Sequence, residues 1–368
     1  MARCGIEILR EHLERGTARP EVWVRFPRQL GDVIFSLPFF GTLQREWNAA
    51  AEALGVKLKW VAVGHAIGAA LFSEADPGLI AESLIETGGQ GKPDPWMLLR
   101  RWRRDRPVAV INLSQSVRLA LAARMAGVPI RGGIADNRLN LLYTHPFRYR
   151  DLPMHCAQRF APLLEKLTGT RKLVFTPISP ATLGGHAAAG KLRAAGWDGQ
   201  PYVSMAFGTR GDGKRWFPQE QTWPALARMV QERGLAVVWL GGPDEVPLGA
   251  QLAALVPGSF NLAGQTTIPE ACALQHGAWG NVCIDTGLAH TGAATGRPTV
   301  TLINDSMETL IGPVGPHALS VRGPAVDLFS DQVQGPLPER LSAHRLAPAR
   351  VWNLLEAMGR ECAEPGRP

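Results

Sequence analysis

The chain has 368 residues, of which 45% are hydrophobic and 19% charged. These proportions exclude a disordered or fibrous chain and suit a globular protein with two cores of ordinary size. The net formal charge of +7 favours acidic partners such as a nucleotide, an anionic glycolipid or a phospholipid surface. There is no apolar run long enough to cross a bilayer and no signal-peptide core, so we expect a cytoplasmic protein. The five cysteines include no C-x-x-C pair, so we expect neither a zinc cluster nor a disulfide framework.

The first half of the chain alternates predicted strands with predicted helices. In order, we expect a helix over 5–15, a strand over 21–26, a helix from 32 to about 47, a strand over 57–63, a helix over 66–72, strands over 79–85 and 107–113, a helix over 117–126, short pieces over 130–133 and 141–146, and a helix over 156–167. Such alternation is typical of a parallel sheet covered by helices on both faces.

A proline-containing segment over 173–185 is interpreted as a linker, after which the alternation restarts. The expected elements are a strand over 202–207, a helix over 221–233, a strand over 236–240, helices over 247–255 and 269–276, a strand that ends at 285, a helix over 288–295, strands over 299–303 and 320–322, and a last helix over 348–358. We therefore predict two doubly wound α/β domains, 1–175 and 176–345, and a C-terminal helix and tail, 346–368, that could pack back on the N-terminal domain.

The stretch 281–304 combines a buried strand, a glycine turn and a helix of small residues. Asp285 ends the strand, Thr286 and Gly287 form the turn, and His290 lies one helical turn further on and can face the same spot. Unpaired amides and the positive end of a helix dipole make such a junction an anion site, at the sheet edge where α/β proteins bind ligands. The same spacing also fits a structural unit in which the aspartate caps the helix and the histidine lies on the surface.

Two other loops follow predicted strands. The loop over 208–216 has three glycines with Thr209, Arg210 and Lys214. Such a flexible basic loop is suited to binding phosphate oxygens, although its spacing is not that of a P-loop. The alternative interpretation is a solvated loop without a ligand. Asp32 follows Gly31 after the first strand. It is either the N-cap of the next helix or a catalytic carboxylate at the sheet edge.

The order of these motifs resembles the ADP-heptose:lipopolysaccharide heptosyltransferases, glycosyltransferase family 9. Asp-Thr-Gly-Leu-Ala-His at 285–290, followed by Gly-Arg-Pro-Thr at 296–299, is similar to the donor-nucleotide motif of that family. Arg-Gln-Leu-Gly-Asp-Val-Ile-Phe-Ser-Leu-Pro at 28–38 is similar to its N-terminal signature, and the loop over 209–216 to its Thr-to-Lys-x-Trp loop. The resemblance covers roughly 21–317 and implies the GT-B architecture, in which two Rossmann-like domains face each other across a cleft.

The resemblance also implies roles for particular residues. Asp32 would be the catalytic base, and Lys214 would stabilise the departing diphosphate. Glu245 would meet the ribose, and the segment that contains Thr267 and Ile268 would pack against the adenine. The residues expected at the donor nucleotide are Thr209, Arg210, Lys214, Glu245, Thr267, Ile268, Asp285, Thr286, Gly287 and His290, and those expected at the acceptor are Gly31, Gln115 and Arg118.

The implied activity is inverting transfer of a heptose from ADP-heptose to an anionic glycolipid, the inner core of lipopolysaccharide, at the inner face of the membrane. We expect no obligatory cofactor or divalent metal, because Asp212 and Asp285 stand alone and form no Asp-x-Asp motif. The alternatives are a family 9 transferase with another nucleotide sugar or acceptor, and a non-catalytic relative that binds a nucleotide or glycan. A nucleic-acid binder is supported by charge alone, and no motif of basic and stacking aromatic residues accompanies it.

Overall fold

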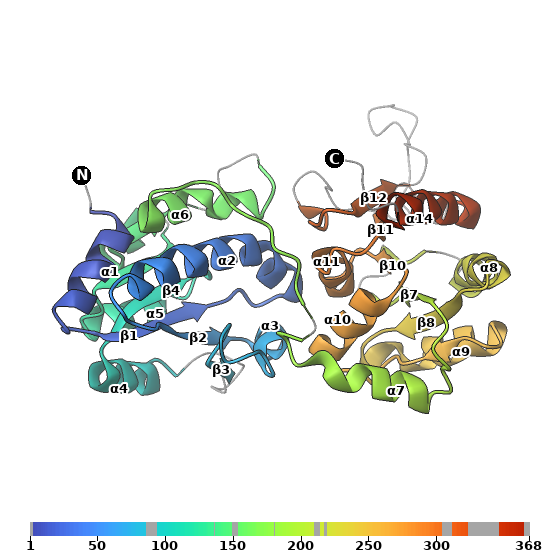
Figure 1. Cartoon of the computed structure of the whole chain (residues 1–368), viewed down its shortest axis with the longest axis horizontal. Helices are drawn as coiled ribbons and strands as arrows, with labels where there is room; N and C mark the ends of the chain where they lie inside the picture. Colours follow the sequence, from blue (N-terminus) through green and yellow to red (C-terminus); the bar gives the residue numbers. More distant parts are fainter. Residues whose placement is uncertain are drawn as a thin grey trace. The chain divides into compact units, whose positions relative to one another are not determined.

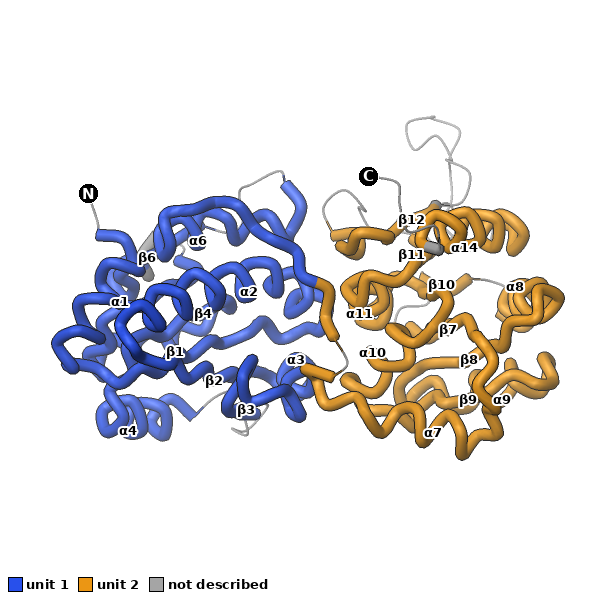
Figure 2. The backbone as a smooth tube through the Cα atoms, in the orientation of Figure 1, with its two compact units in different colours: residues 1–176 blue, residues 177–368 orange. Residues whose placement is uncertain are grey.

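The computed structural model describes residues 3–85, 94–135, 137–148, 154–179, 181–209, 214–216, 219–303, 311–322 and 346–363. The chain divides into two compact units, Met1–Thr176 and Pro177–Pro368 (Figure 2). The division falls inside the segment over 173–185 that the sequence marks as a linker. Each unit is built on one parallel six-stranded sheet.

The first unit has its strands in the order β3-β2-β1-β4-β5-β6. Their bounds are β1 (Arg19–Arg25), β2 (Lys59–Gly64), β3 (Glu82–Ile85), β4 (Pro107–Asn112), β5 (Ile130–Ile134) and β6 (His145–Phe147). Every residue of β4 is buried. Both faces of a central parallel strand are covered, which is why its sequence is a continuous apolar run and not an alternating one.

Helices cover both faces of this sheet. They are α1 (Gly5–Glu14), α2 (Leu30–Glu52), α3 (Ala66–Ala69), α4 (Pro95–Asp105), α5 (Val117–Met125) and α6 (Ala161–Thr168), with 3-10 turns η1 (Ala70–Phe72), η2 (Asn137–Leu142) and η3 (Gln158–Phe160). α1, α2 and α6 contact one another, and α4 contacts α5. Figure 1 shows α2 and α6 on one side of the strands and α4 on the other. Leu98, Trp102 and Leu119 place α4 and α5 in one apolar cluster over the same face.

The second unit has the order β12-β11-β10-β7-β8-β9. The strands are β7 (Tyr202–Ala206), β8 (Ala236–Leu240), β9 (Phe260–Asn261), β10 (Gly280–Ile284), β11 (Thr299–Ile303) and β12 (Ala318–Arg322). In each unit the strand order reverses once, between β1 and β4 in the first and between β7 and β10 in the second. Loops diverge at such a switch point, and the carboxyl end of the strands there is where doubly wound sheets bind ligands.

The helices of the second unit divide between the two faces of its sheet (Figure 1). They are α7 (Ala188–Ala194), α8 (Gln219–Glu232), α9 (Val246–Leu255), α10 (Ile268–Gly277), α11 (Gly287–Ala294) and α14 (Pro348–Ala363), with 3-10 turns η4 (Gly185–Ala187) and η6 (Pro243–Glu245). Val203 and Met205 of β7 lie in the cluster of α8, α9 and α14, and Tyr202 and Ala206 in that of α7, α10 and α11. The alternation along the strand thus divides its side chains between the two layers.

The C-terminal helix α14 belongs to the core of the second unit, and the expectation that it also packs back on the N-terminal domain stays a prediction. Val351, Trp352 and Leu355 are buried in the cluster of α8 and α9, and the ring of Trp352 stacks on Trp279 at 5.9 Å. The apolar stripe of α14 therefore covers a sheet face that belongs to its own unit.

Three features differ from the sequence-based expectations. Neither α7 nor β9 was predicted, because α7 is alanine-rich with Gly190 inside it and β9 has only two residues. α2 begins at Leu30 and continues through Pro38 to Glu52, so Asp32 lies inside its first turn. Within the part of the chain that the structure describes, no helix is both long and apolar enough to span a bilayer.

Candidate functional site

An ion pair joins two of the predicted motifs at the carboxyl edge of the second sheet. Lys214, in the loop after β7, places Nζ 2.8 Å from Oδ2 of Asp285 and 3.3 Å from its carbonyl oxygen. Asp285 follows β10 and is only 3% exposed. A buried carboxylate is stable only with a charged or hydrogen-bonding partner. Asp285 thus holds the ammonium group of Lys214 at the switch point between β7 and β10.

The first turn of α11 lies beside this ion pair. Thr286 is the N-cap residue, but its hydroxyl donates to the carbonyl of Ile284 at 3.4 Å and caps no helix amide. The backbone donors at the start of α11 are therefore not taken up by a side-chain cap, and they carry the positive end of the helix dipole. Asp285 is not the N-cap, and His290 is buried in α11 and not on the surface, so the purely structural interpretation of this stretch is wrong on both residues.

A buried polar cluster under α11 was not anticipated. Gln275 of α10 is fully buried, donates to the carbonyl of Leu288 at 2.7 Å and accepts from the hydroxyl of Thr291 at 2.6 Å. A buried amide with both ends paired fixes the helix that it touches. Gln275 thereby sets the position of the first turns of α11. The sequence held no signal for it, since a glutamine inside a short helix is usually solvated.

The loops after β7 and β8 are packed against each other. Glu245 is the last residue of η6, is half-buried, and accepts the amide of Gly242 at 2.6 Å. A Cβ atom at Gly208 would lie 2.1 Å from Cγ of Glu245. Only glycine at 208 allows this approach, so the predicted ribose-binding acid lies directly beside the predicted phosphate loop. Thr209 follows Gly208, and Arg210 lies outside the described residues.

Thr267 and Ile268 lie at the start of α10. Thr267 is the N-cap and forms a capping box with Glu270: its hydroxyl accepts the Glu270 amide at 3.3 Å, and its own amide donates to the Glu270 carboxylate at 2.8 Å. Lys191 donates to the same carboxylate at 2.6 Å. Ile268 is partly exposed. This pairing fixes the backbone at 267–268 and leaves the Ile268 side chain available for contact.

In the first unit, the predicted acceptor residues lie at the switch point between β1 and β4. The amide of Leu113 donates to the carbonyl of Arg25 at 2.9 Å, so the loops after these two strands begin side by side. Gly31 and Asp32 follow β1 in the first turn of α2. Gln115 lies in the loop after β4, and Arg118 in the first turn of α5; both side chains are exposed.

The N-cap of α2 is Gln29, so Asp32 is not the helix cap that its position after a strand permitted. Its side chain is exposed, yet nearby protein displaces enough water to raise the pKa of its carboxyl above the usual 3.8. An accessible carboxylate with a raised pKa is a stronger base than an ordinary aspartate.

Asn112, at the end of β4, holds the loop that carries Gln115. It is fully buried, and its Nδ2 donates to the carbonyl of Ser116 at 3.0 Å and to the hydroxyl of Tyr143 at 2.8 Å. Its Oδ1 accepts the amide of Ser114 at 3.2 Å. Burial raises the pKa of Tyr143 to about 12, so the phenol stays protonated. Asn112 is therefore a structural residue that fixes the loop after β4.

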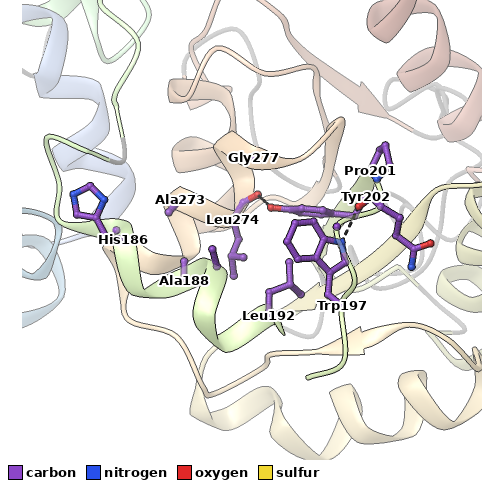
Figure 3. A pocket seen from close by; sticks show the side chains of 13 residues that line it. His186, Ala188, Leu192, Trp197, Pro201, Tyr202, Ala273, Leu274 and Gly277 are labelled. Atoms are coloured by element: carbon purple, nitrogen blue, oxygen red, sulfur yellow. Dashed lines mark hydrogen bonds between the residues drawn. The ribbon is translucent and has the colours of Figure 1, made fainter. Parts of the chain in front are cut away.

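A cavity of about 560 Å³ lies elsewhere in the second unit. It is lined by α7, the start of β7 and α10, including Trp197, Tyr202 and Leu274 (Figure 3). The Tyr202 hydroxyl donates to the Leu274 carbonyl at 2.7 Å. Tyr202 begins β7, so the cavity lies at the amino edge of the sheet, opposite Asp285. No charged side chain lines it, so it does not suit a diphosphate.

No group of three or more histidine, cysteine or acidic side chains is placed to hold a metal ion within the described ranges of the chain. All five cysteines are free thiols. The expectation that no divalent metal is required stays a prediction, since neither observation tests how a bound diphosphate is neutralised.

Comparisons with known proteins converge on one family. The family model described as glycosyltransferase family 9 (heptosyltransferase) matches residues 96–330. The chain is similar to lipooligosaccharide heptosyltransferase 2 of Haemophilus influenzae, at 30% identity over 129 residues, which cover 33% of this chain and 37% of that protein. It is also similar to lipopolysaccharide heptosyltransferase 1 of Pseudomonas aeruginosa, at 26% identity over 306 residues, with 78% and 79% of the two chains covered.

Among solved structures, the chain is similar to that of Escherichia coli ADP-heptose lps heptosyltransferase II, with a TM-score of 0.72 and 21% identity over 94% of this chain and all of that one. At 21% sequence identity, this structural similarity establishes the fold alone. The fold is GT-B, as the resemblance to the family predicted. The match to the Haemophilus influenzae protein spans 37% of that protein's length.

Proposed function

Because the chain belongs to glycosyltransferase family 9, the heptosyltransferase family, we propose that it transfers a heptose from ADP-heptose to the inner core of lipopolysaccharide, with inversion at the anomeric carbon. One observation carries the proposal: Lys214 is held by Asp285 beside the uncapped start of α11. A cation and unpaired helix amides at one spot suit a diphosphate. The names of the similar proteins support heptose as the sugar.

The donor nucleotide would occupy the edge of the second sheet at the switch point between β7 and β10. Its phosphates would meet Lys214 and the amides at Thr286 and Gly287, and the ribose hydroxyls would meet the carboxylate of Glu245. The adenine would pack beside Ile268. The fixed cation and dipole would stabilise the negative charge that develops as ADP departs, so the reaction would need no divalent metal.

The acceptor hydroxyl would react at the edge of the first sheet, where Asp32 would remove its proton. The hydroxyl oxygen would form a bond to the anomeric carbon as the bond from that carbon to the β-phosphate oxygen breaks, and ADP would leave with the bonding electrons. Attack opposite the leaving group inverts the anomeric carbon. Since Asp285 is paired with Lys214, we assign it as a positioning residue for that lysine.

The first test is Asp32→Ala. We expect transfer to fall by roughly 10²–10⁴-fold, the usual contribution of a general base, while calorimetry shows unchanged affinity for ADP. Glu52→Ala is the matched control, because Glu52 is an exposed acid at the other end of the same helix, and it should leave both quantities unchanged. Full activity of Asp32→Ala would refute the assignment of the base.

Two alternatives within the same fold are separated by simple measurements. A thermal shift with ADP, UDP and GDP distinguishes ADP-heptose from another nucleotide sugar, because only the cognate nucleotide should stabilise the second unit. A transfer assay then distinguishes an enzyme from a relative that only binds a nucleotide or glycan. Stabilisation by UDP or GDP and not by ADP would contradict the proposed donor.

A further inference from the structure

Helix α5 presents apolar side chains to solvent as well as to the core. Val117, Leu121 and Met125 are spaced four residues apart, so they form one stripe along the helix, and they are 45%, 46% and 45% exposed. The opposite side of the helix, with Leu119 and Ala122, is buried against the sheet. A surface helix of a monomeric domain normally turns polar residues outward, so this outer stripe needs a separate explanation.

Neighbouring elements extend the stripe. Leu141 in η2 is 79% exposed, and its carbonyl accepts a hydrogen bond from Nη1 of Arg124 on α5 at 2.7 Å. α4 packs along α5 over the same sheet face and begins with Trp96 and Met97, which are 64% and 50% exposed. We call Trp96, Met97, Val117, Leu121, Met125 and Leu141 the apolar patch. Large exposed apolar side chains on elements that pack against one another indicate an interaction surface.

The charged side chains around the patch are mainly positive, although exposed Asp94 caps the start of α4. Residues 95–142 contain nine arginines, no lysine and two aspartates, which is a net charge of +7 and equals the net charge of the whole chain. One of the aspartates, Asp105, is buried and paired with Arg101 and Arg104. Exposed Arg100, Arg103 and Arg118 form no ion pair with any residue that the structure describes. The outer surface of α4 and α5 is therefore both apolar and cationic.

We propose that the apolar patch docks the protein on an anionic lipid bilayer, and this inference rests on the proposed function. Arginines attract the negative surface of such a membrane, while tryptophan and aliphatic side chains insert at its interface. A second copy of this chain fits less well, because a symmetric contact would bring arginines against arginines. A nucleic acid would leave the apolar stripe without a function.

The patch is on the correct side of the sheet to serve the acceptor site. α5 begins directly after the loop with Gln115, at the carboxyl end of β4, and α4 also begins at this edge because it ends at Asp105, just before the amino end of β4. Asp32 lies at the same edge after β1. Trp96, Met97 and Val117 form the part of the patch at this edge, and docking through them would bring this edge of the first unit near the membrane surface, where a lipid-linked acceptor would be located.

The test measures binding of the full chain to vesicles of phosphatidylcholine alone or mixed with phosphatidylglycerol. We expect binding only to the anionic vesicles, with loss at high salt because the attraction is screened. Leu121→Gln combined with Met125→Gln keeps the charge and removes apolar contact, and should weaken binding by about tenfold. Leu255→Gln with Leu319→Gln is the matched control, because both residues are exposed leucines of the second unit, and it should bind like the wild type.

Two enzymatic readouts separate this inference from the proposed function. The patch variant should keep wild-type ADP affinity and wild-type transfer to a delipidated, soluble acceptor, and lose transfer to acceptor embedded in vesicles. Vesicle binding by the patch variant equal to wild type would overturn the inference, as would a wild type that forms dimers through the patch and ignores vesicles. Absence of any transfer with vesicle binding intact would instead refute only the proposed reaction.

Discussion

Asp32 is an exposed carboxylate whose surroundings raise its pKa, and its proposed role as the base predicts a particular pH dependence of the proposed reaction. Only the ionised form can accept the proton of the acceptor hydroxyl. Since desolvation places the pKa above 3.8, the active fraction should decline at a higher pH than it would for an ordinary aspartate.

We therefore predict that kcat falls on the acid side with a midpoint above 3.8. A pH–rate profile measured under saturating donor checks this, and ADP affinity recorded over the same range serves as the control, because a general loss of donor binding would mimic the effect. A midpoint at or below the ordinary aspartate value would show that Asp32 is not the titrating base.

If Lys214 binds the diphosphate as proposed, the Lys214–Asp285 pair couples donor binding to local stability. Lys214→Met should lower ADP affinity by roughly 10–100-fold, the size of one charge-assisted hydrogen bond, and should also destabilise the second unit because Asp285 is left buried without its cation. Calorimetry and chemical denaturation measure the two effects. Lys59→Met, which breaks the contacts with Glu21 and Glu82 in the first unit, should leave ADP affinity unchanged. Equal effects from both variants would contradict a role in donor binding.

At the scale of secondary-structure elements, the close contact between the loops after β7 and β8 should be sensitive to one methyl group. Gly208→Ala would place Cβ 2.1 Å from Cγ of Glu245, which forces the Glu245 side chain out of its position beside the loop after β7. We expect lower affinity for ADP with the fold retained, as measured by calorimetry and circular dichroism.

Gly41→Ala is the matched control for that substitution. Gly41 lies inside α2, and nothing is within 4 Å of a Cβ at this position, so alanine should stabilise the protein by about 0.5–1 kcal/mol through its higher helix propensity. ADP affinity unaffected by Gly208→Ala would show that the spacing of these loops does not matter to the donor.

Some secondary-structure elements could be predicted from the sequence more clearly than others. β4 is an apolar run and β11 is rich in β-branched and aliphatic residues, and the predicted and observed bounds of both nearly coincide, since a central parallel strand is buried on both faces. α7 has little apolar periodicity and was not predicted. Its two buried residues, Ala188 and Leu192, become a helix face only when α10 and the sheet lie beneath them.

At the scale of the whole molecule, the second unit depends on its last helix. Trp352 is 5% exposed and stacks on Trp279 inside the core shared with α8. Trp352→Ala should lower the free energy of unfolding by about 3–5 kcal/mol, the usual loss for a buried aromatic side chain.

Urea denaturation checks this prediction, with Asn353→Ala as the control because Asn353 is the exposed neighbour on the same helix. An unchanged unfolding free energy for Trp352→Ala would mean that α14 is dispensable to the unit. A large loss of unfolding free energy for Asn353→Ala would mean that any substitution in α14 destabilises the unit. The effect of Trp352→Ala could then not be assigned to its burial in the core.

The sequence by itself determined the two α/β domains, the family and the position of each candidate motif after a strand. These conclusions rest on local signals: apolar runs, glycine turns and short motifs whose residues are neighbours in the chain. Since the carboxyl ends of parallel strands share one edge, residues that follow different strands could be assigned to the same edge before any contact was known.

Only the tertiary structure decided which of these residues meet. Lys214 and Asp285 are 71 positions apart, and Asn112 and Tyr143 are 31 apart. The sequence around one residue of such a pair does not identify the residue that it contacts. The strand order places β7 beside β10 and β4 beside β1, and burial then requires each polar side chain there to find a partner. That requirement made Asp285 the anchor of Lys214, and Asn112 the support of the loop after β4.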